Sequence, residues 1–213
     1  PNPYLLSSFV NQKIFTFELS KINNETFWND FKSTKEEENL NSFFWLNLIN
    51  RKNDGEAIQQ IITIWINNNI KYQNKNWDNL QITKRILAWI LNADIILNNT
   101  DKAFRQRFFK SIIMQINHLK KNLSDENDPA KKIEIVSVII LSGLVFKEYN
   151  SNFEKGFRLL KNIVESFFDN DGCPINKNIY DLVQCSKFLI LIKESCKDAQ
   201  EYIPDYLDDI VKK

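Results

Sequence analysis

The sequence is poor in glycine and proline, the two residues that most often interrupt helices. Its 213 residues include only 4 Gly and 5 Pro. Because these residues weaken helix interiors more than any others, such a low content is typical of a mostly helical chain. The length suits one ordinary domain, or one large helical array, with a closed hydrophobic core.

Cysteine and histidine are equally scarce, and their scarcity excludes several kinds of site. The three cysteines are an odd number and widely spaced, so they do not form a disulfide framework. A single histidine excludes a histidine-rich metal site. The P-loop, G-x-G-x-x-G, H-E-x-x-H and C-x-x-C motifs are missing as well. The sequence therefore predicts neither a bound metal nor a cofactor.

No charge of one sign dominates, and no long hydrophobic run is present. The chain has 28 Lys+Arg against 27 Asp+Glu, a net charge of +1, whereas a nucleic-acid binder needs a basic surface to neutralise phosphates. No apolar run reaches the roughly 18 residues of a membrane-spanning helix. We therefore expect neither a nucleic acid nor a membrane as partner. No signal or transit peptide is visible, although the chain begins at Pro1 rather than Met.

Apolar residues recur at helical spacing almost throughout the chain, which predicts an all-α fold. Typical helix-start signals precede several of these stripes, among them Thr100-Asp101, Asp128-Pro129 and Pro204. From Phe43 onward the pattern predicts eight helices. They are centred on residues 43–49, 57–66, 82–97, 104–119, 133–144, 153–167, 182–192 and 204–211.

The chain is predicted to consist of an N-terminal arm, residues 1–38, and a helical domain, residues 39–213. Within the arm, residues 13–19 alternate polar and apolar side chains, which favours a short strand or an extended segment over a helix. Glu36–Glu38 is interpreted as a solvated charge run without a function of its own.

The connections between the predicted helices alternate between short and long. In an array of antiparallel helix pairs, every second connection lies at the same end of the array. The long connections, residues 67–79, 124–128 and 169–178, are therefore predicted to share one rim. Long loops on a helical scaffold usually carry the binding groups, so this rim is the place where we expect function.

Aromatic and basic residues gather on two of these long loops. Trp77 and Arg85 lie in or just after the first, and Lys177 and Tyr180 lie in or just after the third. Aromatic faces stack on sugar rings, and Arg or Lys pairs with carboxylates or sulfates, so a groove with this lining suits an acidic polysaccharide. The alternative, of at least equal weight, is that Trp77 packs its loop against the core and Arg85 meets a neighbouring acid.

Other reactive groups are assigned structural roles. His118 has no nucleophile or orienting acid that can be paired with it from sequence, which favours a packed or surface imidazole. Cys173, Cys185 and Cys196 are interpreted as inert thiols. The run Asp169–Gly172 lacks the later acidic ligand of a calcium loop, so a turn is predicted there.

Five stretches occur in the same order as in a known family. One reads Trp77-Asp78-Asn79-Leu80, followed by Arg85-Ile86-Leu87-Ala88-Trp89, and corresponds to a Trp, polar loop, Arg-Ile/Leu-x-x-Trp pattern. Together the stretches resemble the helical N-terminal region of the bacterial heparinase II/III-like family of polysaccharide lyases. The resemblance runs from about Asn39 to the C-terminus. The stretches are residues 44–46, 77–90, 103–119, 168–178 and 202–210.

The resemblance implies a fold, an activity and partners. The fold is an incomplete (α/α) toroid of antiparallel helix hairpins followed by a C-terminal β-sandwich domain, which this chain would lack. Members of the family cleave uronate-containing polysaccharides by β-elimination, in which neutralising the carboxylate stabilises the enolate-like transition state. The implied partners are an acidic polysaccharide and the β-sandwich domain of the parent chain, without a cofactor. A bacterial protein, periplasmic or cytoplasmic, is implied.

One stretch carries residue-level implications. Residues 168–178 resemble the family's Asp-Gly-Gly-His-x-Ser-Arg-Asn segment, which makes Asn178 the candidate for neutralising the substrate carboxylate. Lys177 stands where the family usually has Arg, and Cys173 and Pro174 replace its Gly-His pair. The catalytic Tyr and a second His are expected beyond Lys213. The chain alone is therefore expected to be inactive.

Competing functions remain open at this point. The chain is either the helical domain of a lyase or a non-catalytic helical scaffold that binds a glycan or a protein partner. Convergence of Asn178 and Arg85 on an open cleft would favour the lyase, whereas a rim closed by packing would favour the scaffold. A third possibility, a glycosidase, requires two carboxylates beside a cleft, and Asp78 and Asp171 are the rim pair available.

Overall fold

Helices form where the apolar stripes predict them. The structure, a computed structural model, describes residues 5, 8–9, 28, 36–48, 55–71 and 76–213. Within these residues no β-strand forms, and a single antiparallel bridge joins Phe168 to Pro174. The all-α prediction is therefore confirmed for the described part of the chain. None of the described helices is both long and apolar enough to cross a membrane. The predicted arm at residues 13–19 lies outside the described residues.

The chain divides into two compact units. One unit comprises residues 10–118, and the other combines residues 1–9 with residues 119–213. The predictions of one helical domain over residues 39–213, and of a rim shared by the Trp77 and Gly172 loops, concern both units at once. Both therefore stay predictions.

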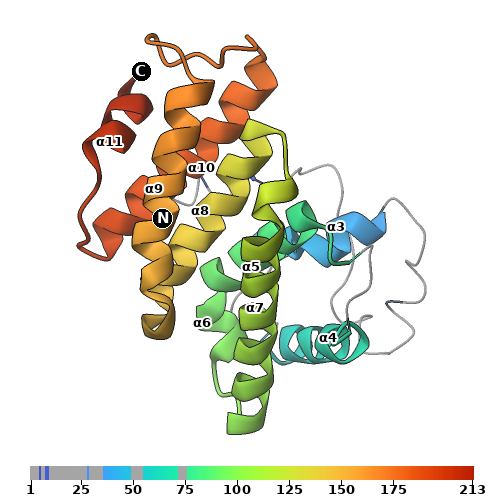
Figure 1. The fold of residues 1–213 in the computed structure, drawn as a ribbon. Coiled ribbons are helices and arrows are strands. Elements are labelled where there is room, and N and C mark those ends of the chain that lie inside the picture. Colours follow the sequence, from blue (N-terminus) through green and yellow to red (C-terminus); the bar gives the residue numbers. More distant parts are fainter. Residues whose placement is uncertain (1–4, 6–7, 10–27, 29–35, 49–54, 72–75) are drawn as a thin grey trace. The chain divides into compact units, whose positions relative to one another are not determined.

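The unit of residues 10–118 consists of short and medium helices (Figure 1). The run Glu36–Glu38 is the first turn of a helix rather than a separate charged segment, and the segment after Phe43 is a 3₁₀ helix. The elements are α3 (Glu36–Ser42), η2 (Phe44–Leu48), α4 (Gly55–Asn68), α5 (Asn79–Leu91), α6 (Ala93–Leu97) and the part of α7 (Lys102–Asn122) up to His118.

The helix predicted over residues 82–97 is divided into α5 and α6 at Asn92. Asn92 has a φ of −115°, outside the helical range, and its side-chain Nδ2 donates to Ala88 O at 2.8 Å and to Asn47 Oδ1 at 2.9 Å. A side-chain amide that bonds to the preceding turn competes with the helical ladder. The apolar periodicity continues past Asn92, so the break is not visible in the hydrophobic pattern.

Aspartates cap two helices of this unit. Asp78 Oδ1 accepts from the backbone N–H groups of Leu80 and Gln81 at the start of α5. Asp101 Oδ1 accepts from the N–H of Phe104 at 2.6 Å, which confirms the cap predicted at Thr100-Asp101. A cap of this kind satisfies backbone donors that have no partner within the helix, and it is worth about 1 kcal/mol.

Aromatic rings form the core of this unit. Trp65 and Trp89 meet edge to face at 5.6 Å between ring centroids, and Phe43 meets Trp89 at 5.3 Å. Trp89 also contacts Phe108 of α7 at 5.1 Å. Each such pair contributes about 1 kcal/mol beyond the area that it buries. The cluster therefore joins the residue before η2 to α4, α5 and α7 around one point.

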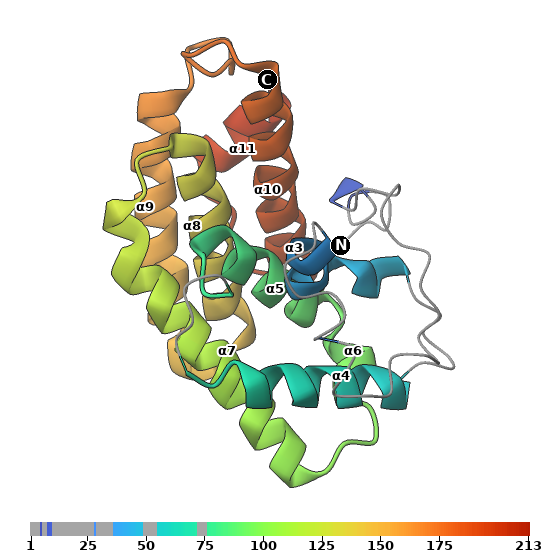
Figure 2. The same cartoon turned by 90° about the vertical axis from the view of Figure 1, so that its right-hand side faces the viewer.

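The second unit is a stack of long helices, and Figures 1 and 2 show α8 lying between α9 and α10, with α11 against α10. Asp128 caps α8 through the N–H of Ala130, and Pro129 is its first residue, as predicted. Its elements are η3 (Leu123–Asp125), α8 (Pro129–Val145), η4 (Lys147–Tyr149), α9 (Ser151–Phe167), α10 (Ile179–Asp198) and α11 (Asp205–Lys212).

The α8 helix is the centre of this stack because it is apolar on nearly every side. A helix that is hydrophobic all round has to be covered on all faces. By contrast, α9 and α11 are strongly amphipathic and bury one face each. The buried aliphatic residues of α8 are Ile133, Ile135, Val136, Val138, Ile139, Ile140 and Leu141.

Two glycines allow α8 and α9 to approach closely. A Cβ atom added to Gly143 of α8 would lie 2.3 Å from the backbone N of Phe153, and one added to Gly156 of α9 would lie 2.5 Å from Ile140 Cγ1. Near Gly143, Asn152 Nδ2 donates to Ser142 Oγ at 3.0 Å in a buried contact. The contact between the helices therefore requires residues without a side chain at both positions.

We predict that Gly143→Ala lowers the free energy of unfolding by about 3 kcal/mol, because the new methyl group would displace backbone rather than a flexible side chain. The matched control is Gly55→Ala at the start of α4, where the nearest atom, Ile95 O, is 3.9 Å from the added Cβ. The control should be neutral or stabilising by up to about 1 kcal/mol. Denaturant titration followed by circular dichroism measures both, and equal stabilities would contradict the close packing.

Candidate functional site

The loop between α9 and α10, residues 169–178, is organised by one carboxylate. Asp169 Oδ1 accepts from the backbone N–H groups of Asp171 at 3.0 Å and of Cys173 at 2.9 Å. Gly172 adopts a φ of 77°, the left-handed conformation that favours glycine. The turn predicted for Asp169–Gly172 is confirmed. Within the described residues, no three His, Cys, Asp or Glu side chains gather to hold a metal ion.

The second half of the loop ends in the cap of α10. Asn178 Oδ1 accepts from the N–H of Tyr180 at 3.0 Å, and the N–H of Asn178 donates to Asn176 Oδ1 at 3.0 Å. Asn176 Nδ2 donates in turn to Asp181 Oδ2 at 2.7 Å. The candidate catalytic residue Asn178 is thus a capping residue that holds a fixed position. Its exposed Nδ2 group has no partner in the described part of the chain.

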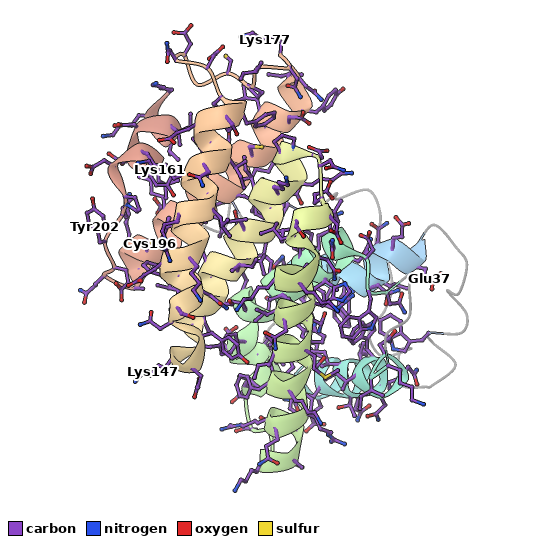
Figure 3. The ribbon with its side chains drawn as sticks, viewed as in Figure 1. Glu37, Lys147, Lys161, Lys177, Cys196 and Tyr202 are labelled. Carbon is purple, nitrogen blue, oxygen red and sulfur yellow. The ribbon has the colours of Figure 1, made fainter. Side chains whose placement is uncertain are left out.

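Lys177 is exposed next to this cap and forms an ion pair with Asp169. Its Nζ lies 2.5 Å from Asp169 Oδ2, so one carboxylate both closes the turn and holds the ammonium group. The hydrogen bond from Lys177 lowers the pKa of Asp169, and the same bond raises the pKa of Lys177. Figure 3 shows Lys177 on the loop that joins α9 to α10.

Tyr180 and its neighbours form an exposed surface at the start of α10. The exposed fraction of Tyr180 is 82%, and those of Ile175 and Ile179 are 60% and 61%. We call Ile175, Lys177, Asn178, Ile179 and Tyr180 the α10 rim. Three of the predicted site residues, Lys177, Asn178 and Tyr180, therefore lie together on one exposed surface.

Arg85 occupies a different environment from the predicted groove. It has no exposed surface, and its guanidinium carbon lies 4.1 Å from the ring centroid of Trp65. Burial lowers the pKa of Arg85 to about 9, which leaves the group charged at neutral pH. Its nitrogens donate to Gln115 Oε1 at 2.7 Å, Asn41 O at 2.9 Å and Asn76 O at 2.8 Å.

The prediction that Arg85 binds substrate is corrected by this burial. A guanidinium without exposed surface cannot pair with a polysaccharide carboxylate, and each of its three nitrogens already donates a hydrogen bond within the protein. The alternative of a neighbouring acid is also wrong in detail, because the recorded partners are an amide and two backbone carbonyls. The signal was present in the sequence, since Arg85 falls on the apolar stripe of Ile82, Ile86 and Trp89.

Trp77 is also a packing residue rather than a sugar-stacking platform. Its exposed fraction is 7%, and its indole ring meets His118 edge to face at 5.3 Å between centroids. The substrate-binding prediction for Trp77 is therefore corrected, because neither face of a buried ring is open to a sugar. The alternative, in which Trp77 packs its loop against the core, is confirmed. Of the two possibilities left open for His118, a packed or a surface imidazole, the structure shows a half-buried ring packed against Trp77.

Two cavities lined by described residues lie away from the three exposed site residues. One cavity of about 210 Å³ lies under the α9–α10 loop, between that loop, α10 and α11. Another of about 420 Å³ lies in the unit of residues 10–118, next to α3 and the start of α5. The α10 rim contributes no residue to the lining of the first cavity, which borders the same loop through the neighbouring turn, residues 171–173. The first cavity is lined mainly by Phe168, Cys173, Leu182, Leu189, Ile210 and Val211, and the second by Glu37, Asn41, Asn76, Asp78, Gln81 and Lys84.

The organising role of Asp169 was missed by sequence reasoning. The sequence pattern Asp169-Asn170-Asp171-Gly172 indicated a turn, but not that the same carboxylate would hold Lys177 eight residues later. The carboxylate pair required for a glycosidase, Asp78 and Asp171, belongs to two separate units and stays a prediction. Asp78 is engaged as the cap of α5.

Comparison with known proteins yields no relative: no family model, curated protein or solved structure matches the chain. The resemblance to the heparinase II/III-like family therefore depends on the five sequence stretches alone.

We predict that Arg85→Ala lowers the free energy of unfolding by about 3 kcal/mol or more, because it leaves buried carbonyl and amide oxygens without donors and opens a cavity. Arg107→Ala, which removes an exposed arginine from α7, is the control and should change stability by less than about 0.5 kcal/mol. Urea denaturation compares the two variants. Similar effects would show that Arg85 is not a structural residue.

Thiol labelling provides a second check of the packing. Burial raises the pKa of Cys185 to about 12 and that of Cys196 to about 11, so neither forms appreciable thiolate at pH 8. Cys173 is half-buried. We predict that a thiol-specific reagent labels Cys173 alone in the native chain and all three cysteines after unfolding, as counted by mass spectrometry. Native labelling that survives in Cys173→Ser would contradict the burial of the other two.

Proposed function

We propose that the chain is the helical domain of a heparinase II/III-like protein and binds an acidic, uronate-containing polysaccharide for β-elimination. In the complete protein its helices would form an incomplete (α/α) toroid of antiparallel hairpins, followed by a β-sandwich domain. The support is the order of the five family-like stretches, which run over the confirmed helices α5, α7 and α11 and the loop before α10.

The observation that carries the proposal is the exposed run Lys177–Tyr180. The Nδ2 group of Asn178 is a hydrogen-bond donor held in place by the cap, and the Lys177 ammonium is one residue away. Donors of this kind neutralise a uronate carboxylate and so favour removal of the adjacent proton. The exposed ring of Tyr180 supplies an apolar face for a sugar.

The ion pair with Asp169 limits how strongly Lys177 binds an anion. A polysaccharide carboxylate has to share the ammonium group with Asp169 Oδ2, which already accepts from it. A shared and exposed ion pair contributes little to binding because water screens its charges. With Arg85 and Trp77 buried, we expect the α10 rim to bind a single sugar unit weakly and to depend on further contacts for affinity.

The catalytic groups are expected outside this chain. His118 is packed against Trp77, and Tyr206 donates from its hydroxyl to Phe157 O at 2.8 Å in a largely buried position. Burial raises the pKa of Tyr206, which is the wrong direction for a base. Another part of the complete protein would supply the tyrosine and histidine, of which one removes the proton on C5 and the tyrosine protonates the leaving 4-oxygen.

We predict that Asn178→Asp weakens binding to alginate, a polyuronate, about tenfold. Aspartate keeps the Oδ1 acceptor that caps α10, but it replaces the Nδ2 donor by a negative oxygen that repels a carboxylate. Asn127→Asp adds the same charge to another exposed loop of the same unit and should change the affinity little. Affinity electrophoresis through alginate-containing gels measures both, and equal mobility shifts would contradict the assignment of Asn178.

The chain by itself should produce no unsaturated product from alginate, heparan-type or hyaluronan-type substrates. Ultraviolet absorbance of the conjugated double bond monitors the reaction continuously. A robust increase would overturn the proposal that the catalytic groups lie elsewhere in the protein.

A second candidate function is a non-catalytic scaffold that binds a glycan or a protein partner. It is favoured by the aliphatic side chains of the rim, because Ile175 and Ile179 are more than half exposed and Val183, one turn further along α10, is 49% exposed. Aliphatic surface of this kind suits a protein better than a sugar. Failure of the native chain to bind any of the acidic polysaccharides would favour a protein-binding scaffold.

A further inference from the structure

Helix α7 carries six cations and no anion, in a chain whose net charge is +1. Such separation of charge within one helix creates a local positive field that the overall balance conceals. The nearly zero net charge of the whole chain therefore does not describe the surface of α7. The six cations are Lys102, Arg105, Arg107, Lys110, Lys120 and Lys121.

Helix stability explains Lys120 and Lys121, which stand in the last turn where the helix dipole favours positive charge, but it does not explain the cations at the start of α7. Three of the cations, Lys102, Arg105 and Arg107, stand in the first two turns of α7, where the helix dipole disfavours positive charge. The acid next to them, Asp101, is engaged as the cap of Phe104 N–H. The cations in the first two turns therefore destabilise the helix slightly, and we look for another reason for their presence.

The cations fall into engaged and unengaged groups. Arg105 donates to Thr100 Oγ1 at 2.9 Å and to Leu97 O at 3.2 Å, which secures the turn before α7. Arg107 and Lys110 are exposed, and within the described residues neither takes part in a hydrogen bond or an ion pair. They are therefore available to a ligand.

Arg107 and Lys110 share one exposed face of α7 with two amides. Gln106 and Asn117 are exposed on the same side of the helix, opposite the buried stripe. At 1.5 Å per residue, this face extends about 16 Å from Gln106 to Asn117. The buried stripe consists of Phe104, Phe108, Ile112, Ile116 and Leu119.

We propose that this face of α7, formed by Gln106, Arg107, Lys110 and Asn117, is a second contact surface for an acidic polysaccharide. The inference rests on the proposed function and adds to it, because the α10 rim alone offers one shared cation. Arginine and lysine pair with carboxylates or sulfates, and the amides bond to sugar hydroxyl groups. A straight row of such groups fits an extended chain of repeating acidic units.

A polysaccharide fits this surface better than a nucleic acid does. The aromatic rings of α7 are turned inward or packed, because Phe104 and Phe108 are buried and Phe109 meets Phe108 edge to face at 5.7 Å. Single-stranded nucleic acids bind through exposed rings on which bases stack. Four of the six cations, Lys102, Arg107, Lys110 and Lys121, have no partner among the described residues, and four are also few for the phosphate backbone of a duplex.

The test compares two double variants of the 213-residue chain for binding to alginate at low salt. Arg107→Gln/Lys110→Gln removes both charges from α7, and Gln is a good helix former, so folding should be retained. Lys155→Gln/Arg158→Gln removes an exposed pair of the same residue types, also three residues apart, from α9. Circular dichroism confirms that both variants are folded.

The expected result is a loss of affinity of about fivefold to tenfold for the α7 variant and less than twofold for the α9 variant. The affinity of the native chain should fall as salt is added, and the α7 variant should show the weaker salt dependence. Dextran, which is uncharged, should bind to none of them.

Each other outcome overturns a particular proposal. Suppose that the native chain binds alginate, that Asn178→Asp lowers this affinity and that the α7 double variant keeps it. The α7 surface is then excluded, and the proposed function stands. Equal losses in the α7 and α9 variants would show non-specific attraction and overturn the α7 surface. Tighter binding to duplex DNA than to alginate would identify α7 as a nucleic-acid surface. No alginate binding by the native chain would overturn both proposals.

Discussion

The buried guanidinium of Arg85 is the interaction on which the unit of residues 10–118 depends. It lies over the Trp65 ring and donates to Gln115 of α7 and to the backbone carbonyls of Asn41 and Asn76. One side chain on α5 thus holds three other segments and stacks on α4. Because a buried charge is costly unless every donor is used, this network also fixes the arrangement of those segments. The same engagement removes Arg85 from any contact with a ligand.

The second unit depends on burial rather than on a polar network. The apolar α8 helix is covered by α9 and α10, and the glycines of α8 and α9 permit the close contact. On this base the loop before α10 is held by Asp169, which bonds to two backbone N–H groups and to Lys177. A rigid scaffold with an ordered loop presents Asn178 and Tyr180 in fixed positions. Function is therefore expected on this surface and on the cationic face of α7.

Much of the fold follows from local signals that act over a few residues. The apolar stripes predicted the helices, and the starts at Asp101, Asp128 and Pro204 agree with the structure. The break at Asn92 was missed, because an amide that bonds to the preceding turn leaves the hydrophobic period unchanged. The candidate site was predicted in part: Lys177, Asn178 and Tyr180 are exposed together, whereas Trp77 and Arg85 are buried.

What the sequence determined by itself was the helical class, most helix starts and the turn at Asp169–Gly172. Each of these depends on neighbours within about one turn of chain, where residue identity and spacing suffice. Only the tertiary structure decided that Arg85 lies inside the protein, that Asp169 pairs with Lys177, and which cations of α7 remain without partners. These outcomes depend on contacts between residues far apart in the chain, such as Arg85 with Asn41. The type and sequence position of a long polar side chain are the same whether it binds a ligand or the protein's own backbone. Which of the two it binds is decided by the residues that pack around it.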